Sequence, residues 1–263
     1  MQHNLQIIPI PAFKDNYIWL IHHHQQAVIV DPGDAIPVLE TLRQLNLTLH
    51  TILITHHHQD HIGGVSLLQT TYPHAKVYAP KLEQFTFEHL AVSELDTIHL
   101  KEFCLSFSVI DLPGHTLGHI AYFCQNVEKN SHLENILFCG DTLFGAGCGR
   151  IFEGTATQMQ HSLAKLAALP TATKVYCTHE YTLQNINFAL TLEPNNKALI
   201  ERFIETQKIR EINLPSLPST IALELATNPF LRCYSNEIQS AIHLKNASNI
   251  EVFSTIRELR NNY

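Results

Sequence analysis

Short apolar runs alternate with helical patterns along the first two thirds of the chain. The runs have the length and composition of buried strands, and turn residues follow most of them: LQIIPI, YIWLIHH, QAVIVDPG, TILITHH, KVYAP, LSFSVIDLPGH, HIAYFCQN, NILFCGD and KVYCTHE. Apolar positions spaced near 3.6 residues predict helices over 35–46, 64–70 and 155–169. Strands and helices interspersed on this scale predict a layered α/β domain.

The character of the chain changes after about residue 180. Helical periodicity covers 193–211, 236–246 and 249–260, and a Leu-Pro-rich break, LPSLP, stands at 214–218. Few strand-like runs remain in this part. We therefore divide the chain into a catalytic domain, 1–178, and a small helical domain, 179–263.

Composition narrows the class of protein. The chain has 263 residues, 45% of them hydrophobic, and a formal net charge of -7. Its 17 scattered Lys and Arg residues do not form the cationic face that binding to nucleic acid requires, although a few local cations suffice for a small anionic substrate. Six cysteines without a CxxC pair indicate reduced core residues, and no window reaches membrane-spanning length. We expect a cytoplasmic monomer without a nucleic-acid or membrane partner.

The densest group of metal-binding side chains is the run THHHQDH, residues 55–61. The apolar run 51–54 leads into it and Gly63-Gly64 follows, so we place it where a buried strand turns into a loop before a helix. In an extended segment alternate side chains share a side. His56, His58 and Asp60 would then face one point, while the two residues between them, His57 and Gln59, would face away.

His61 adds a second group of donors. It adjoins Asp60, and this adjacent pair cannot easily serve the same ion in the same way as His56 and His58, so one motif suggests two metals. The alternative is a histidine-rich surface tract, which is how we interpret residues 22–24: a solvated turn before Gln25-Gln26. A carboxylate and imidazoles at fixed spacing after a buried strand favour the metal site for 56–61.

Further candidate ligands stand at the ends of other strand-like runs. His115 follows LSFSVIDLPG, Asp141 follows NILFCG, and His179 follows KVYCT. A lone histidine in such a place is more often structural, but its recurrence at several strand ends favours a shared site. The donors divide into a first ion held by His56, His58 and His115, a second held by Asp60, His61 and His179, and a bridge through Asp141.

These donors predict hydrolytic chemistry. Imidazole and carboxylate suit zinc, and also manganese or iron, and the absence of thiolates favours an open site. Two divalent cations and two carboxylates, Asp60 and Asp141, favour a bridging hydroxide, because coordination lowers the pKa of water from about 15.7 towards about 7. We therefore name Asp60 and Asp141, with that hydroxide, as the catalytic groups.

The motifs THHHQDH, LPGHTLGH, FCGDTLF and CTHEY, in this order, resemble the metallo-β-lactamase superfamily. Within it, FKDNYIWLI, AVIVDPGD, GAGCGRIFEG, HEYT, NPFLR and TIRELR are similar to the glyoxalase II (hydroxyacylglutathione hydrolase) family over essentially the whole chain. The resemblance implies a four-layer αββα sandwich with a small C-terminal all-α domain. It also implies two divalent metal ions, zinc above all.

The same resemblance implies hydrolysis of S-acylglutathione thioesters, chiefly S-D-lactoylglutathione, to glutathione and D-lactate, as the second step of methylglyoxal detoxification. The family's glutathione contacts would fall on Arg150, Phe152, Tyr181, Arg257 and Arg260. The family often has lysine at the positions of Arg150 and Arg260 and tyrosine at that of Phe152. Phe152 lacks the tyrosine hydroxyl, whereas contacts through the main chain of Arg150 and Phe152 can survive both changes, so side-chain and main-chain contacts stay open as alternatives. Arg257 and Arg260 share a helix face, and on their own they would suggest a solvated surface.

Other functions stay open at this point. A glutathione persulfide dioxygenase with the same fold would use one metal and lack the helical domain, and a nuclease would carry a basic surface beside the site. A metal-binding module without catalysis is a third alternative. Asp31, Thr116 and Asp111 are candidates for supporting the ligands, with turn or cap roles as the alternative.

Overall fold

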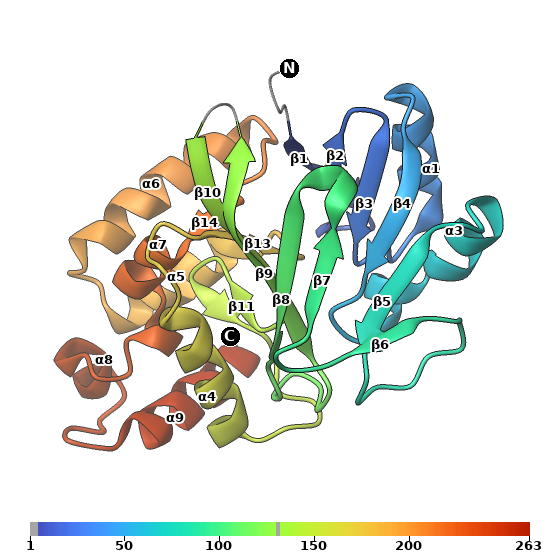
Figure 1. Cartoon of the computed structure of the whole chain (residues 1–263). Helices are drawn as coiled ribbons and strands as arrows, with labels where there is room; N and C mark the ends of the chain where they lie inside the picture. Colours follow the sequence, from blue (N-terminus) through green and yellow to red (C-terminus); the bar gives the residue numbers. More distant parts are fainter. Residues whose placement is uncertain (1–4, 130–131) are drawn as a thin grey trace.

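The computed structural model describes residues 5–129 and 132–263, which form two six-stranded sheets and the helices around them (Figure 1). The first sheet has the strand order β1-β2-β3-β4-β5-β6. Its strands are β1 (Gln6–Ala12), β2 (Asn16–His23), β3 (Gln26–Val30), β4 (Thr48–Leu53), β5 (Lys76–Pro80) and β6 (Leu90–Val92). Strands β3 to β6 pair in parallel, so their carboxyl ends lie at one edge.

The second sheet has the order β14-β13-β10-β9-β8-β7. Its strands are β7 (Thr97–Leu100), β8 (Leu105–Asp111), β9 (Ile120–Lys129), β10 (His132–Gly140), β13 (Lys174–Cys177) and β14 (Ser219–Thr220). A small hairpin of β11 (Leu143–Phe144) and β12 (Gly147–Cys148) follows β10. Strands β10 and β13 are parallel, so their carboxyl ends also share an edge.

The helices of the first two thirds stand between the strands in sequence, and the longer ones lie on the outside of the two sheets (Figure 1). They are α1 (Ala35–Gln44), α2 (Gln59–Ile62), α3 (Val65–Thr71) and α4 (Ala156–Ala167), with a short 3₁₀ helix η1 (Lys101–Phe103). Helix α1 begins where the Asp34 carboxylate accepts the N–H of Ile36, and it buries Val38 and Leu42 one turn apart. Apolar burial on one face is what holds this helix against the first sheet.

The main core lies between the two sheets. Trp19 on β2 meets Tyr176 on β13 edge to face, with ring centroids 4.9 Å apart, and the Trp19 indole N–H donates to the carbonyl of Cys177. A second apolar cluster joins the outer face of the first sheet to α1 and α3. The layers are therefore helix, sheet, sheet and helix, and the predicted four-layer αββα sandwich is confirmed.

The C-terminal third is helical, as predicted. It contains α5 (Thr182–Leu192), α6 (Lys197–Glu211), α7 (Ile221–Thr227), α8 (Asn236–Ala241), α9 (Asn249–Asn261) and the 3₁₀ helix η2 (Pro229–Leu231). In the described part of the chain, no helix is both long and apolar enough to cross a membrane. The division at 178/179 stays a prediction.

Several boundaries differ from the sequence prediction. The helix expected over 193–211 begins at Lys197, because the Asn196 side chain caps it by accepting the N–H of Leu199. The helix expected over 236–246 ends at Ala241. Helices α5 and α7 were not predicted. Helix α5 exposes Gln184, Asn187 and Thr191 on one face, but two of the residues that it buries, Thr182 and Asn185, are polar, and this weakens the apolar periodic pattern.

Two predictions about single residues were wrong. The tract 22–24 is not a solvated turn throughout: His22 and His23 end strand β2, His23 is buried, and only His24 has the left-handed backbone (φ 52°) of a turn. Cys104 is exposed and also left-handed (φ 53°), whereas the other five cysteines are buried and free, as expected of reduced core residues.

Candidate metal centre and substrate pocket

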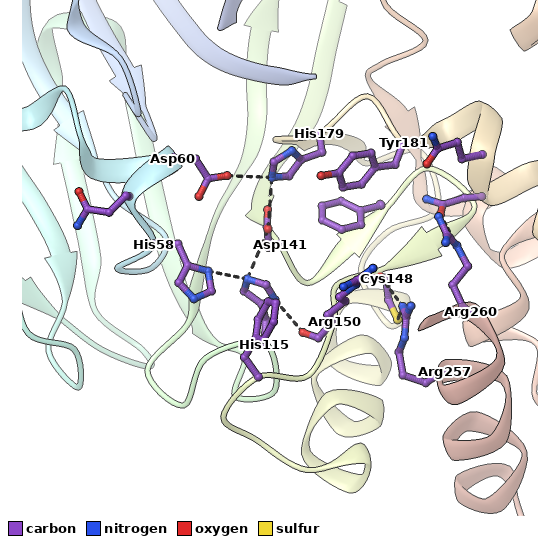
Figure 2. Close-up of a pocket in the computed structure, with 15 residues that line it drawn as sticks. His58, Asp60, His115, Asp141, Cys148, Arg150, His179, Tyr181, Arg257 and Arg260 are labelled. Atoms are coloured by element: carbon purple, nitrogen blue, oxygen red, sulfur yellow. Dashed lines mark hydrogen bonds and ion pairs between the residues drawn. The ribbon is translucent and has the colours of Figure 1, made fainter. Parts of the chain in front are cut away.

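Three imidazoles meet at one end of the first sheet. The chain leaves β4 in an extended conformation, and His58 Nδ1 lies 3.1 Å from His56 Nε2. The same nitrogen lies 3.0 Å from Nε2 of His115, which comes from the loop after β8 (Figure 2). The structure thus brings the predicted first set of donors together from two separate loops.

The second set gathers around the start of a short helix. The carboxylate oxygen Asp60 Oδ2 lies 3.6 Å from His61 Nε2 and 3.4 Å from His179 Nε2. Asp60 does not continue the extended segment, because helix α2 begins at Gln59 and turns Asp60 and His61 towards His179. The expectation that Gln59 faces away was therefore wrong: it lines the same pocket as Asp60.

Asp141 stands between the two sets. Its Oδ1 lies 3.4 Å from His61 Nε2. Its Oδ2 lies 3.4 Å from both His115 Nε2 and His179 Nε2 (Figure 2). Two ligands about 2.1 Å from a tetrahedral zinc ion are themselves about 3.4 Å apart. The spacing of these donor atoms therefore suits ligands that share metal ions, and the location of Asp141 suits the predicted bridge.

Two buried atoms in this group lack other partners. Among the described residues, His61 Nε2 and Asp141 Oδ1 have no hydrogen bond although both are buried. A buried polar atom without a partner is costly, and a metal ion would remove that cost for both. Donor atoms lie close enough to hold metal in three overlapping groups: His56, His58 and His115; His56, His61 and Asp141; and Asp60, His61 and His179.

Neighbouring groups fix which nitrogen of each histidine faces the site. The Asp31 carboxylate accepts from His61 Nδ1 at 3.0 Å, and the Asp15 carboxylate accepts from His179 Nδ1 at 2.9 Å. His115 Nδ1 donates to the carbonyl of Arg150 at 2.7 Å. With these N–H groups engaged, the Nε2 atoms keep lone pairs for a metal ion.

The other two candidates for supporting the ligands behave differently. Thr116 donates its hydroxyl proton to Glu83, so it contacts the site only through its neighbour His115. Asp111 bonds through its main chain to Glu94 and Lys165, and among the described contacts none joins it to a predicted ligand. Asp111 therefore belongs to the end of β8.

The electrostatics of the two sets differ. Burial lowers the pKa values of His56, His58 and His115, which keeps these imidazoles neutral and ready to bind a metal ion. Burial also acts on His61, but the carboxylates of Asp141 and Asp31 outweigh it and raise its pKa to about 10. At neutral pH a metal ion in the second set therefore replaces a proton.

Sequence reasoning missed three residues that border the ligands. His119 is buried, stacks on His56 and accepts the N–H of Asp141 at 3.1 Å, and Asn16 donates to Asp60 Oδ2 at 3.1 Å. Asp15, named above, is the third. His119 had a usable signal, because it closes the quoted motif LPGHTLGH. Asp15 and Asn16 also lie in a quoted motif, FKDNYIWLI, but the residues of that motif do not by themselves point to a role beside the ligands.

Gly140 shows how tightly this region is packed. It ends β10 with a left-handed backbone (φ 46°), and a Cβ atom there would lie 2.3 Å from Thr55 Oγ1 and 2.8 Å from His119 Nε2. Glycine satisfies both the conformation and the space. It thereby places Asp141, the next residue, between the two donor sets.

A pocket of about 650 Å³ opens from the metal-binding donors towards the C-terminal helices (Figure 2). All five predicted glutathione contacts line it: Arg150, Phe152, Tyr181, Arg257 and Arg260. Tyr181 stacks on His179 with ring centroids 4.7 Å apart, and Phe152 meets His115 edge to face at 5.2 Å. The pocket therefore joins the donor sets at one end to a group of arginines at the other.

The arginines are held by the protein on one side. Arg257 is buried and donates from Nη1 to the carbonyl of Cys148 at 2.8 Å, while its buried Nε has no hydrogen-bond partner among the described residues. Arg260 donates from Nε and Nη2 to Asn185 Oδ1 at 3.3 and 3.2 Å. Both guanidinium groups keep donors for a carboxylate.

Comparison with known proteins finds similarity over nearly the whole chain. Residues 13–179 match the family model described as metallo-beta-lactamase superfamily, and residues 180–263 match the model described as hydroxyacylglutathione hydrolase C-terminus. A hydroxyacylglutathione hydrolase of Methylobacillus flagellatus is 54% identical, with 98% of this chain and 99% of the relative covered. One of Albidiferax ferrireducens is 47% identical, with 98% and 100% covered.

A solved structure agrees with the fold. The B3 metallo-beta-lactamase BLEG-1 superposes with a TM-score of 0.60 at 25% identity, covering 86% of this chain and 99% of that one. The superfamily match and the cluster of histidines and aspartates together support a dinuclear divalent metal site. The chain belongs to the hydroxyacylglutathione hydrolase family of the metallo-β-lactamase superfamily.

Proposed function

We propose that the protein hydrolyses S-acylglutathione thioesters, chiefly S-D-lactoylglutathione, to glutathione and a 2-hydroxy acid, D-lactate, as the second step of methylglyoxal detoxification. The observation that carries the proposal is near full-length identity of 54% and 47% to relatives named hydroxyacylglutathione hydrolase. A pocket that joins metal-binding donors to arginines supports it, because the substrate has a thioester in the middle and carboxylates on its peptide part.

The metal ions are part of the proposal. We assign the first ion to His56, His58 and His115, the second to Asp60, His61 and His179, and the bridge to Asp141. We propose zinc as the metal, since nitrogen and oxygen donors at this spacing suit it. When bound, the two ions supply a hydroxide nucleophile at neutral pH and stabilise negative charge that develops on the substrate.

The arginines orient the peptide part of the substrate in the proposed complex. The free donors of Arg257 and Arg260 bind a carboxylate, and Arg150 adds a third cation at the exposed rim. Because Arg257 is tied to Cys148 and Arg260 to Asn185, their guanidinium groups are held before substrate arrives. Anchoring at this end leaves the thioester over the donor sets.

Aromatic side chains shape the middle of the pocket. Phe152 and Tyr181 lie beside the donor histidines, with ring contacts to His115 and His179 respectively. Burial raises the pKa of Tyr181, so its hydroxyl stays protonated and can donate to the substrate. The leaving thiol has an ordinary pKa of about 8.5, so it needs little protonation, and the site requires no separate general acid.

The decisive experiment measures hydrolysis of S-D-lactoylglutathione by purified, zinc-loaded protein, followed by the loss of thioester absorbance. We expect turnover that Asp141→Ala abolishes and that Asp96→Ala, an exposed aspartate on another loop, leaves unchanged. Oxygen uptake with glutathione persulfide tests the dioxygenase alternative in parallel. Intact thioester after long incubation with metal-loaded protein, or oxygen uptake in its place, overturns the proposal.

A further inference from the structure

His57 stands between two proposed ligands but points away from the metal-binding donors. Its Nδ1 lies 3.1 Å from Glu83 Oε2, and its Nε2 lies 3.4 Å from Glu153 Oε1. Both ring nitrogens therefore lie within ion-pair distance of a carboxylate, on two sides of the ring, although Glu83 Oε2 has no hydrogen bond among the described residues. A rotation of the backbone of the segment 56–58 would move the His57 ring away from these carboxylates.

The same two carboxylates hold the other ligand-bearing loop. Glu83 Oε1 accepts the hydroxyl proton of Thr116, and Glu153 Oε2 accepts the N–H of Leu117 at 2.8 Å. Thr116 and Leu117 directly follow the proposed ligand His115. Each glutamate therefore contacts the segment 56–58 on one side and the segment 115–117 on the other.

Close packing keeps Glu83 in place. Its side chain is only 2% exposed, and it lies in the turn just beyond β5. A Cβ atom on Gly118 would lie 2.3 Å from Glu83 Cγ, so the loop that carries His115 packs directly on this glutamate. Glu153 is 37% exposed and closes the group from the solvent side.

Joining two loops through a buried carboxylate has a cost in free energy. Desolvation opposes it, and an apolar contact of the same size stabilises a fold at least as well. What a carboxylate adds is direction, since Glu83 accepts a hydrogen bond through Oε1 and lies within ion-pair distance of His57 through Oε2. The arrangement therefore suits a role in geometry more than a role in stability.

From these contacts we propose that His57, Glu83 and Glu153 are positioning residues that fix His56 and His58 relative to His115, and thereby set the affinity of the first metal ion. The second set is oriented by other groups, Asp31, Asp15 and Asn16, none of which belongs to this cluster. Loss of the cluster should therefore weaken the first ion and spare the second. The inference rests on the metal site of the proposed function but not on its substrate.

The test is a double-mutant cycle read out by metal binding in the absence of substrate. His57→Ala, Glu83→Gln and the double variant are titrated with zinc against a chromophoric chelator, and zinc occupancy at each position is read from anomalous diffraction. We expect each single variant to weaken the first ion about 10- to 100-fold, the usual cost of losing a group that orients a ligand, with the second ion within about 3-fold. The double variant should lose little more than either single one, because the residues act together.

Matched controls come from another histidine and glutamate. His50 Nε2 lies 3.5 Å from Glu102 Oε2, a similar contact outside the pocket, so His50→Ala and Glu102→Gln should leave both ions unchanged. His57 is one third exposed, so His57→Ala should fold even if a change at Glu83 does not. The inference is overturned if folded His57→Ala binds zinc with unchanged affinity, or if it loses affinity equally for the first and the second ion. The test measures zinc binding alone, so it decides the inference even if the protein binds two zinc ions without hydrolysing thioesters.

Discussion

Glu224 on α7 is a buried group whose removal should lower the free energy of unfolding. Its Oε1 accepts from Arg202 Nη2 at 2.6 Å and from the Ser219 hydroxyl, while its Oε2 accepts the N–H of Ala146 at 2.8 Å and Asn228 Nδ2 at 2.9 Å. The glutamate side chain is 0% exposed and the arginine side chain 5%. Glu224 thus joins the C-terminal helices to the turn between β11 and β12.

Replacing Glu224 with leucine leaves the Arg202 guanidinium buried without its counter-ion. Breaking a buried pair in this way costs about 3–5 kcal/mol. Arg202 keeps two hydroxyl acceptors, Thr227 at 2.6 Å and Ser219 at 3.2 Å, so we expect the lower end of that range. The N–H of Ala146 also loses its acceptor, which adds about 1–3 kcal/mol. We therefore expect Glu224→Leu to lower the free energy of unfolding by about 4 kcal/mol.

Urea unfolding followed by circular dichroism measures this change, at one fixed zinc concentration because bound metal adds to apparent stability. Glu205→Ala, an exposed glutamate on α6, is the control and should stay within about 0.5 kcal/mol of the parent. The double variant Arg202→Met/Glu224→Leu should recover much of the loss, because it no longer buries an unpaired charge. A loss below about 1 kcal/mol for Glu224→Leu would refute the reasoning.

Three further predictions concern the pocket and the response to pH. Phe152→Tyr adds a hydroxyl at the pocket wall, so KM for S-D-lactoylglutathione should fall about 2- to 10-fold with kcat little changed in steady-state assays. Asn185→Leu removes the acceptor that holds Arg260, and KM should rise about 10-fold, again with kcat little changed. Burial alone would raise the pKa of Glu193, but hydrogen bonds, chiefly from Arg232, lower it in the folded protein. The ionised Glu193 carboxylate therefore stabilises the fold fully above the unfolded pKa of about 4.3, and this stabilisation is lost as pH falls through the lower pKa of the folded state. Urea midpoints between about pH 6 and pH 3 should therefore fall less steeply in Glu193→Gln, and parallel curves would contradict this.

The sequence predicted the groups that follow regular strands. His115, Asp141 and His179 each come shortly after an apolar run, and in parallel strands such positions meet at one edge, so their convergence follows from the fold class. The extended geometry assumed for 55–61 failed at Gln59, because a helix of one turn is too short to give a periodic pattern.

The supporting residues could not be predicted in the same way. Asp15 and His179 are 164 positions apart in sequence, and Asn16 and Asp60 are 44 apart. Asp15 stands in the turn between β1 and β2, Asn16 is the first residue of β2, and a polar residue at a turn has many ordinary explanations. Only the pairing of β1 and β2 beside the second sheet brings their side chains to the ligands.

The chain contains one tryptophan, Trp19, and its location makes it an internal reporter. Its indole N–H donates to the carbonyl of Cys177, two positions before His179, and its ring packs against Tyr176 on the facing sheet. Fluorescence emission excited selectively in this ring therefore comes from a single place, where the two sheets meet beneath the second donor set. Separation of the sheets exposes the indole to water and shifts that emission to longer wavelength, without any label.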